Sequence, residues 1–323
     1  MLKTITRLFI FAGLLLAEVV AIGQDPYFAG VQDMNIWYNP ALKTNKLPLA
    51  FVSIRNVKYP NIISYSSKAA TIELPLTNKE GTDFDNVLFA NLAAGISTDN
   101  SSEGFMKASS AMLALSLALP LNYDNTYIAM GFHGNYSFNQ VGTGISNLFP
   151  DDFDKYGALN WAMRNDPYQT GSNYGYFTSG VGVALFHSGE QTQWYIGGSI
   201  RHFNHPYTEW SRSARLSSNN GIQIGYTSAI NNLADISGYG NFTWQGGTNE
   251  QIIGARYIRH LSDSTKNSFS VGLGYRAHIA LIPDASLQIK RSRFSFYYEI
   301  NVSYITSRNY GRRSVEFSYR FNL

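Results

Sequence analysis

The last ten residues of the chain, SVEFSYRFNL, alternate strictly between apolar and polar side chains. One phase holds Val315, Phe317, Tyr319, Phe321 and Leu323, and the other holds Ser314, Glu316, Ser318, Arg320 and Asn322. Successive side chains of a β-strand point to opposite faces, so this period predicts a strand with one wholly apolar face. Chain ends usually fray, so a terminal strand of this kind indicates that its apolar face is covered.

The same alternation recurs in the middle of the chain. SSAMLALSLALPL sets the leucines at 113, 115, 117, 119 and 121 against Met112, Ala114, Ser116 and Ala118. SFSVGLGYRA and RFSFYYEINVSY follow the same rule, with aromatic and aliphatic residues on one face and Gly, Ser, Arg, Glu and Asn on the other. An amphipathic helix repeats about every 3.6 residues and cannot produce these runs.

From Leu47 onward, alternating segments of about ten residues are separated by clusters of Asn, Asp, Gly and Ser, which is typical of membrane-spanning strands. About fourteen strands are expected, an even number as in bacterial single-chain barrels. They span 47–57, 64–76, 88–98, 109–121, 126–140, 174–187, 193–204, 219–230, 234–246, 248–261, 268–277, 278–290, 293–304 and 312–323. With both termini in the periplasm, the short connections such as LNYDNT and RSR are periplasmic, and the longest, 142–173, is outside.

A secreted β-sandwich or propeller would also alternate, but its outward face would be polar. Here the apolar phase is Leu, Phe, Tyr and Ile, which predicts an all-β, transmembrane antiparallel β-barrel, monomeric, with lipid outside and a water-exposed lumen. On this interpretation Val315 to Leu323 face lipid. Leu117→Arg and Leu273→Arg should impair folding into membranes, and Ser116→Arg, on the lumen phase, should be tolerated better.

The first residues, MLKTITRLFIFAGLLLAEVVAIGQ, have the order of a Sec signal peptide. Lys3 and Arg7 precede an apolar run that closes on Ala21-Ile22-Gly23, and Glu18 interrupts the run, which is short for a membrane anchor. We therefore expect residues 1–23 to be a signal peptide and 47–323 to be an outer-membrane barrel. Residues 24–46 lack a sustained period and are interpreted as a periplasmic or lumen-packed segment.

The amino-acid composition excludes several classes of protein and of binding site. The chain of 323 residues has no cysteine, which excludes disulfides, a thiolate metal site and a lipobox. A net charge of +3, with Lys and Arg spread along the chain, argues against nucleic acid as a partner. Charged residues make up 15 % of the chain, where about 25 % is ordinary, while it holds 22 Tyr, 20 Phe and 28 Gly. This composition suits a barrel with aromatic girdles.

The sequence contains only weak candidates for a metal site or a catalytic site. His202 and His205 are spaced i,i+3 at a strand end with no third ligand nearby, so solvated rim histidines are favoured over a metal pair. Asp151, Asp152 and Asp154 lack the EF-hand pattern, so an acidic loop is favoured over calcium. The sequence has no GxSxG, HExxH or P-loop motif, and we expect neither an enzyme nor a cofactor.

Charges on the lumen phase lie mainly on the last five expected strands. They are Arg256, Arg276, Lys290, Arg293, Glu299, Glu316 and Arg320, and they can either line a pore or fix a plug. A discriminating feature is whether Trp37 and Tyr38 pack inside the barrel beside them, because that would block passive flux. In the longest connection, Phe149, Phe153, Tyr156, Trp161 and Tyr168 form a candidate partner-binding loop, or alternatively a lid over the barrel mouth.

Several stretches resemble one family in its order along the chain. NIWYNPAL, SSKAATIELPL, YFTSGVGVALFHSGEQTQWYIGGSIRHFNHP and SVEFSYRFNL are similar to segments of the type IX secretion PorP/SprF membrane proteins. The usual NPAYAG of that family reads Asn39-Pro40-Ala41-Leu42-Lys43-Thr44 here, and its RxQW reads Arg55-Asn56-Val57-Lys58.

The resemblance implies an outer-membrane protein of Bacteroidota in the type IX secretion and gliding system. It implies a non-enzymatic role in the export or surface attachment of large adhesins that carry a C-terminal secretion domain. Periplasmic ring or peptidoglycan-binding secretion components would be further partners, besides outer-membrane lipid. The alternative is a passive porin or a hydrophobic-substrate channel.

Overall fold

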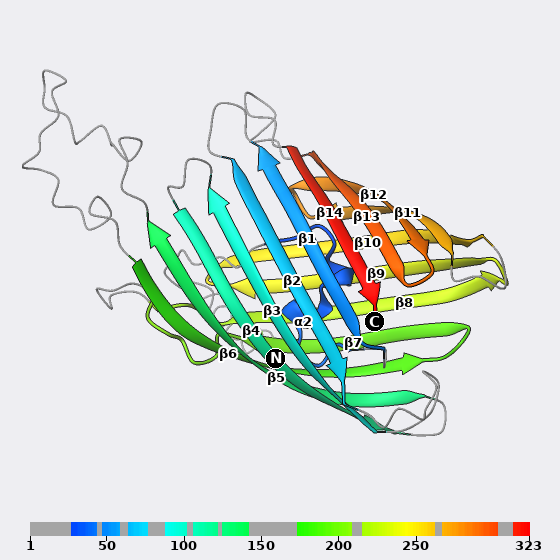
Figure 1. The fold of residues 1–323 in the computed structure, drawn as a ribbon, viewed down its shortest axis with the longest axis horizontal. Coiled ribbons are helices and arrows are strands. Elements are labelled where there is room, and N and C mark those ends of the chain that lie inside the picture. Colours follow the sequence, from blue (N-terminus) through cyan, green and yellow to red (C-terminus); the bar gives the residue numbers. More distant parts are fainter. Residues whose placement is uncertain are drawn as a thin grey trace, which may run out of the picture.

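The computed structural model describes residues 27–43, 47–58, 64–76, 88–101, 106–121, 125–141, 173–208, 215–261, 267–302 and 313–323. Its fourteen strands form one closed antiparallel barrel in which each strand pairs with its neighbours in sequence and β1 pairs with β14 (Figure 1). Closure gives every strand a partner on both sides, as a membrane-spanning sheet requires. The predicted barrel class and strand number are confirmed.

The strand bounds follow the predicted segments closely. The strands are β1 (Leu49–Lys58), β2 (Tyr65–Pro75), β3 (Phe89–Ser101), β4 (Met106–Pro120), β5 (Thr126–Val141), β6 (Asn173–Ser188), β7 (Thr192–Arg201), β8 (Asn219–Asn231), β9 (Ala234–Gln245), β10 (Thr248–His260), β11 (Ser268–Arg276), β12 (Ala280–Ile289), β13 (Ser292–Asn301) and β14 (Arg313–Asn322). Strand β7 ends three residues earlier than expected. His202 has a φ of 58°, in the left-handed region that a strand cannot continue through.

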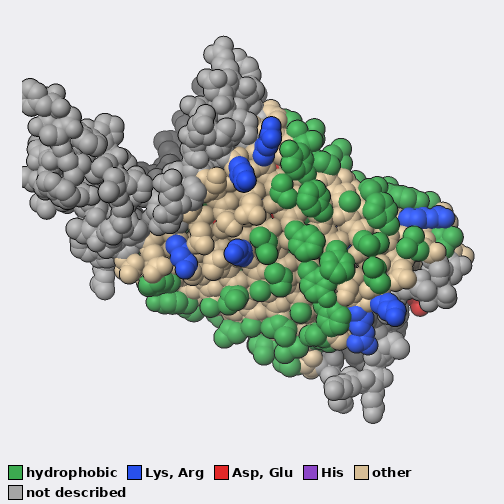
Figure 2. Space-filling view, turned by 45° about the horizontal axis from the view of Figure 1, so that its top comes forward, with side chains coloured by type: hydrophobic (Ala, Val, Ile, Leu, Met, Phe, Trp, Pro, Cys, Tyr) green, Lys and Arg blue, Asp and Glu red, His purple; other side chains and the backbone are tan. Residues whose placement is uncertain are grey.

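The two phases of each strand separate as the alternation predicts. Leu113 and Leu273 are 64 % and 55 % exposed on the outer surface, while Met112 and Ala114 are each 3 % exposed. Large apolar side chains cover much of the outer wall, as Figure 2 shows for one face. The described residues contain no helix that is both long and apolar enough to span a membrane.

Turn lengths are less asymmetric than the sequence indicated. The β8–β9 and β12–β13 connections are tight, as expected of the predicted periplasmic end. The β9–β10 connection, at the predicted outer end, is a two-residue turn, Gly246-Gly247, with φ values of 52° and 78°. Two residues with positive φ suit the primed hairpin turns whose twist matches that of the strands, so the outer end also carries a minimal hairpin.

The lumen is filled, contrary to the expected water-exposed interior. The short helices η1 (Val31–Asp33) and α2 (Asn35–Tyr38) lie inside the barrel (Figure 1). Residues of this segment pack against inward side chains of β1, β2, β9 and β10; the apolar cluster consists of Phe28, Val31, Met34, Tyr38, Phe51, Ala69, Tyr239 and Ile252, with Trp37 against it. Trp37 and Tyr38 therefore lie where passive flux would have to pass.

This packing changes one expectation from the sequence. Ser116 is on the lumen phase, as predicted, and is only 5 % exposed. Its cross-strand partner Gly131 lies against the backbone of Pro40. An arginine at position 116 would enter packed space, so we now expect Ser116→Arg to be damaging through overpacking.

Candidate functional site in the barrel lumen

Residues 27–43, called the lumen segment below, are almost entirely buried. They contain little regular structure, so most of their backbone groups need partners on the barrel wall or in turns of the segment itself. The wall provides those partners at several points around the barrel.

Glu316 on β14 binds the start of the lumen segment. Its carboxylate accepts hydrogen bonds from the backbone N–H groups of Ala29 (2.5 Å) and Gly30 (3.2 Å), and from the Ser53 hydroxyl (3.0 Å). Gly30 has no room for a side chain, because a Cβ there would lie 2.9 Å from the ring of Tyr297. A glutamate that is 1 % exposed therefore fixes the backbone of the segment to the last strand.

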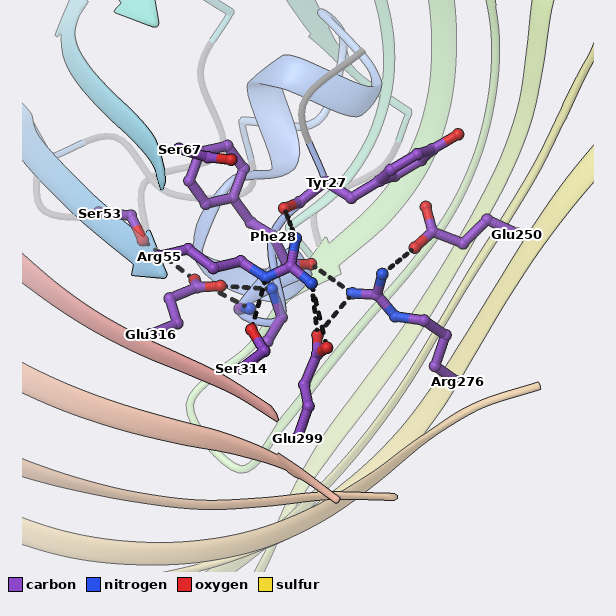
Figure 3. A network of polar contacts seen from close by, with 12 residues as sticks. Tyr27, Phe28, Ser53, Arg55, Ser67, Glu250, Arg276, Glu299, Ser314 and Glu316 are labelled. Carbon is purple, nitrogen blue, oxygen red and sulfur yellow. Dashed lines mark hydrogen bonds and ion pairs between the residues drawn. The ribbon is translucent and has the colours of Figure 1, made fainter. Parts of the chain in front are cut away.

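A chain of buried charges continues from this point (Figure 3). The Arg55 guanidinium donates through Nη2 to both carboxylate oxygens of Glu299, at 3.0 Å each, and through Nη1 to the carbonyl of Tyr27 at 2.5 Å. Arg276 lies between Glu299 (3.0 Å) and Glu250 (2.9 Å), and it donates to the carbonyl of Phe28 at 3.3 Å. Charge-assisted contacts are the strong class of hydrogen bonds, and two of them here, from Arg55 and Arg276, end on the segment's own backbone.

Asp33 anchors the 3-10 helix to β13. The hydroxyl of Tyr297 donates to its Oδ2 at 2.6 Å, and Arg293 lies 3.7 Å from its Oδ1. Burial by itself would raise the pKa of the Asp33 carboxyl, but nearby Arg293, Arg256 and Arg320 and the Tyr297 hydrogen bond hold that pKa below its ordinary value. Asp33 is therefore held in its charged form. Its contribution to stability is lost only when the pH falls through this lowered pKa.

The Asn39-Pro40 turn fits a hollow in the wall made by glycines. The side-chain amide of Asn39 donates to the carbonyls of Val183 and Gly198, at 3.2 Å each, and to Gln223 Oε1 at 3.0 Å. Its Oδ1 accepts from the backbone N–H of Ala41 at 2.9 Å, which closes the turn. Asn39 is 0 % exposed, and these bonds give its buried amide group both donor and acceptor partners.

Gly131 and Gly198 give a matched test of this fit. A Cβ at Gly131 would lie 2.5 Å from the carbonyl carbon of Pro40, whereas a Cβ at Gly198 meets its nearest atom at 3.9 Å. We expect Gly131→Ala to lower the free energy of unfolding by about 1 to 3 kcal/mol, the usual cost of overpacking. Gly198→Ala should change it by less than about 0.5 kcal/mol. Urea titration of the protein in lipid vesicles measures both, and equal effects would show that the turn does not need the hollow.

Further contacts tie the rest of the segment to β2 and β7. The indole N–H of Trp37 donates to Thr71 Oγ1 at 2.7 Å, and Ser199 donates to the carbonyl of Tyr38 at 2.7 Å. At the end of the segment, the ammonium of Lys43 forms an ion pair with Glu73 at 2.9 Å, and both side chains are buried. The segment is thus held by strands on opposite sides of the barrel.

The predicted lumen charges fall into three groups. Arg256, Arg276, Glu299 and Glu316 are buried among the contacts described above, with Arg256 paired to Asp284 at 2.8 Å. Arg293 and Arg320 are partly exposed on the same side of the barrel. Lys290 does not join them: β12 ends at Ile289, so Lys290 lies exposed in the β12–β13 turn, with a φ of 54°.

Sequence reasoning missed six of the paired groups, namely Asp33, Lys43, Arg55, Glu73, Glu250 and Asp284. Arg55, Glu250 and Asp284 occupy lumen-phase positions of their strands, which was the available signal. The five aromatic residues of the candidate loop, Phe149, Phe153, Tyr156, Trp161 and Tyr168, lie outside the described residues, as do Asp151, Asp152 and Asp154.

The two rim histidines differ from each other. His205 is exposed, as expected, and its Nδ1 lies 3.1 Å from the carbonyl of Leu216. His202 is 3 % exposed, so the expectation of a solvated side chain is wrong for it. Within the described part of the chain, no three His, Cys, Asp or Glu side chains come together in a way that could hold a metal ion.

A small cavity of about 80 Å³ remains beside the lumen segment. Trp37 and Tyr38 line it from the segment, and Asp99, His133, Arg201 and His202 line it from the wall. The filled lumen and the lipid-facing wall together define an outer-membrane β-barrel with an internal plug.

The family model of the type IX secretion system membrane protein PorP/SprF matches residues 21–321, and the chain belongs to this family. It is accordingly an outer-membrane protein of a secretion system. This membership is consistent with a protein that is not an enzyme. It also implies contact with lipid and with other secretion components.

Solved structures with a similar fold are distant in sequence. The monoaromatic hydrocarbon channel CymD is 9 % identical, with 92 % of this chain and 94 % of that chain covered and a TM-score of 0.52. The Pseudomonas putida toluene transporter TodX is 8 % identical, with 93 % and 95 % covered and a TM-score of 0.53. At such identity the likeness concerns the fold alone. No curated protein matches the sequence.

Proposed function

We propose that the protein is a non-enzymatic, plugged component of the secretion machinery that assists export or surface attachment of large adhesins and links the outer membrane to periplasmic components. The observation that carries this proposal is the lumen segment, whose backbone is held by buried Glu316, Arg55 and Arg276. Each of these charges is already engaged by protein groups. Because these lumen charges already hold the plug, they are not available to bind a partner. Partners would therefore bind at the two rims of the barrel.

The outer rim is proposed to hold the secreted client, through connections 142–173 and 205–218. Barrel walls are committed to lipid and strand pairing, so specificity belongs on loops. The described part of the second connection supports this assignment. Tyr207 forms a β-bridge with Arg215, whose guanidinium lies 4.6 Å from the tyrosine ring, and Tyr207 remains 41 % exposed. Phe203, just before this connection, is 43 % exposed. Aromatic residues and arginine are the favoured anchors of protein interfaces.

The periplasmic turns and residues 24–46 are proposed to face the ring or peptidoglycan-linked components. The predicted signal peptide, residues 1–23, lies outside the described residues and stays a prediction. Residues 28–43 of this segment are largely enclosed by the barrel, so a periplasmic partner would reach mainly its ends and the short turns.

Replacing residues 145–170 by a short Gly-Ser linker tests the client-binding proposal in cells. We expect the adhesin to disappear from the cell surface while the barrel still assembles, because the strands and the lumen segment do not include this stretch. Surface labelling of the adhesin is the readout, and heat-modifiable gel mobility of the barrel is the assembly control. Normal adhesin display after the replacement would remove this loop from the client-binding site.

The alternative function is a passive porin or hydrophobic-substrate channel. Two solved structures of similar fold are a monoaromatic hydrocarbon channel and a toluene transporter. Planar-bilayer recording separates the two proposals. The filled lumen leads us to expect no large, long-lived channels from the purified protein. Stable single channels of high conductance would favour the porin over the secretion adaptor.

A further inference from the structure

The outer wall at β14 and β1 to β5 carries basic side chains without acidic ones. Four cations point outward and are exposed: Lys58, Lys68, Lys107 and Arg313. The acidic residues described on these strands, Glu73, Asp99 and Glu316, lie on the lumen phase. None of the four cations forms an ion pair with another described residue, so the described part of this surface carries a net positive charge.

The four cations gather at one end of the strands. Lys58 ends β1 and Arg313 begins β14, and the two are direct cross-strand partners. Lys107 is the second residue of β4 and Lys68 the fourth of β2, with only β3 between these strands. Neighbouring strands lie nearly 5 Å apart, so Lys68 and Lys107 are separated by about 10 Å across the sheet. Figure 2 shows basic side chains toward the upper left of this face, and others at its right-hand end.

An apolar groove of about 960 Å³ lies next to these cations on the same wall. Small outward residues make it: Ala70, Ala94 and Ala111 stand where other outward positions carry Leu, Ile or Phe. Larger side chains, including Ile96 and Phe132, form its sides. Lys68 is the next outward residue after Ala70 on β2, so the cationic area borders the groove directly.

We propose that this surface binds one class of ligand, a phosphorylated and multiply acylated glycolipid of the outer leaflet. Its phosphates would pair with the four cations, and an acyl chain would fill the groove. Charge-assisted contacts to phosphate are strong hydrogen bonds, and burial of apolar area adds to them. The end that carries the cations is the one opposite to the chain's C-terminus, which the predicted orientation places outside the cell.

The vertical order of charge and groove favours a lipid over a protein partner. A protein that covered this wall would have to enter the bilayer beside the barrel to fill the groove and also place carboxylates at the level of the cations. A lipid already presents its phosphate at the interface and its chains at the level of the groove. This inference does not depend on the secretion role proposed above, since it concerns the outer wall alone.

Binding of fluorescent diphosphoryl lipid A to the purified full-length protein in detergent tests the proposal. We expect saturable binding that weakens with added salt, because exposed charges are screened. The variant Lys58→Gln/Lys68→Gln/Lys107→Gln/Arg313→Gln should bind at least about tenfold more weakly, a loss of about 1.4 kcal/mol. The matched control Arg259→Gln/Lys290→Gln removes two exposed cations at the opposite end and should bind as the wild type does.

The groove has its own pair of variants. Ala70→Leu/Ala94→Leu fills it and should weaken binding, whereas Ala255→Leu, on the outward face of β10, should not. Gel mobility with and without heating shows that each variant has folded. Unchanged affinity of the fourfold variant would overturn the proposal, and so would equal binding of phosphatidylethanolamine. Unchanged affinity of the filled-groove variant would overturn the assignment of an acyl chain to the groove.

Discussion

Glu299→Ala should lower the free energy of unfolding by about 3 to 5 kcal/mol, the cost of leaving buried charges without their partner. Glu299 is 2 % exposed and is paired with both Arg55 and Arg276 at 3.0 Å. Its loss removes the ion-pair partner of Arg55 and leaves Arg276 paired with Glu250 alone. Both arginines also donate to the carbonyls of Tyr27 and Phe28, so the start of the lumen segment should loosen with them.

Urea titration of tryptophan fluorescence in lipid vesicles measures the loss, and limited proteolysis reports release of the segment. Glu190→Ala is the matched control, because Glu190 is an exposed glutamate in the β6–β7 turn, and it should change stability by less than about 0.5 kcal/mol. The variant should also open channels in planar bilayers that the wild type lacks. If Glu299→Ala is as stable and as closed as Glu190→Ala, the ion pairs do not hold the plug.

The second large effect is expected on the lipid-facing wall. Leu273 is 55 % exposed near the middle of β11, where an arginine at the bilayer midplane costs about 2 to 4 kcal/mol. Leu273→Arg should therefore impair folding into vesicles, and Leu117→Arg, on the same phase of β4, should act likewise. Leu261 is 61 % exposed just beyond the end of β10, and an arginine there should cost only about 0 to 1 kcal/mol.

Folding yield into vesicles, measured by heat-modifiable gel mobility, and urea titration of the folded fraction provide the comparison. The depth dependence is the informative result, because it separates a lipid-facing wall from an ordinary hydrophobic surface. Equal tolerance of arginine at positions 273 and 261 would contradict the membrane position assigned to β11.

The strands and their two faces could be predicted because they are local properties. A period of two fixes which side chains share a face whatever the strand pairs with, so Leu113 and Met112 were assigned to opposite faces correctly. The even strand number follows from counting such segments. Strand ends depended on single residues, and β7 stopped early at the left-handed His202.

The contents of the lumen depend on contacts between residues far apart in sequence, which no local period reports. Arg55 and Glu299 are 244 residues apart, and Asn39 reaches Gln223 across 184. Lumen-phase charges gave the right candidates in part, but their partners could not be chosen without the strand register. Lys290 shows a different limit of the sequence pattern. Its position in the alternation was compatible with the lumen, but it lies one residue beyond the end of β12.

The place where the lumen segment is fastened has a consequence for biogenesis. Arg55 and Glu316 are direct partners across the β1–β14 seam, and Ser53 and Ser314 complete their hydrogen bonds. The first and last strands of the barrel can meet only after the whole chain has been synthesised. Until then Ala29 and Gly30 lack their acceptor and Arg55 lacks Ser314 and Glu299. Sealing of the barrel thus completes the anchoring of the segment's start at Ala29 and Gly30, whereas the contacts of Trp37 and Tyr38 with β2 and β7 do not need the seam.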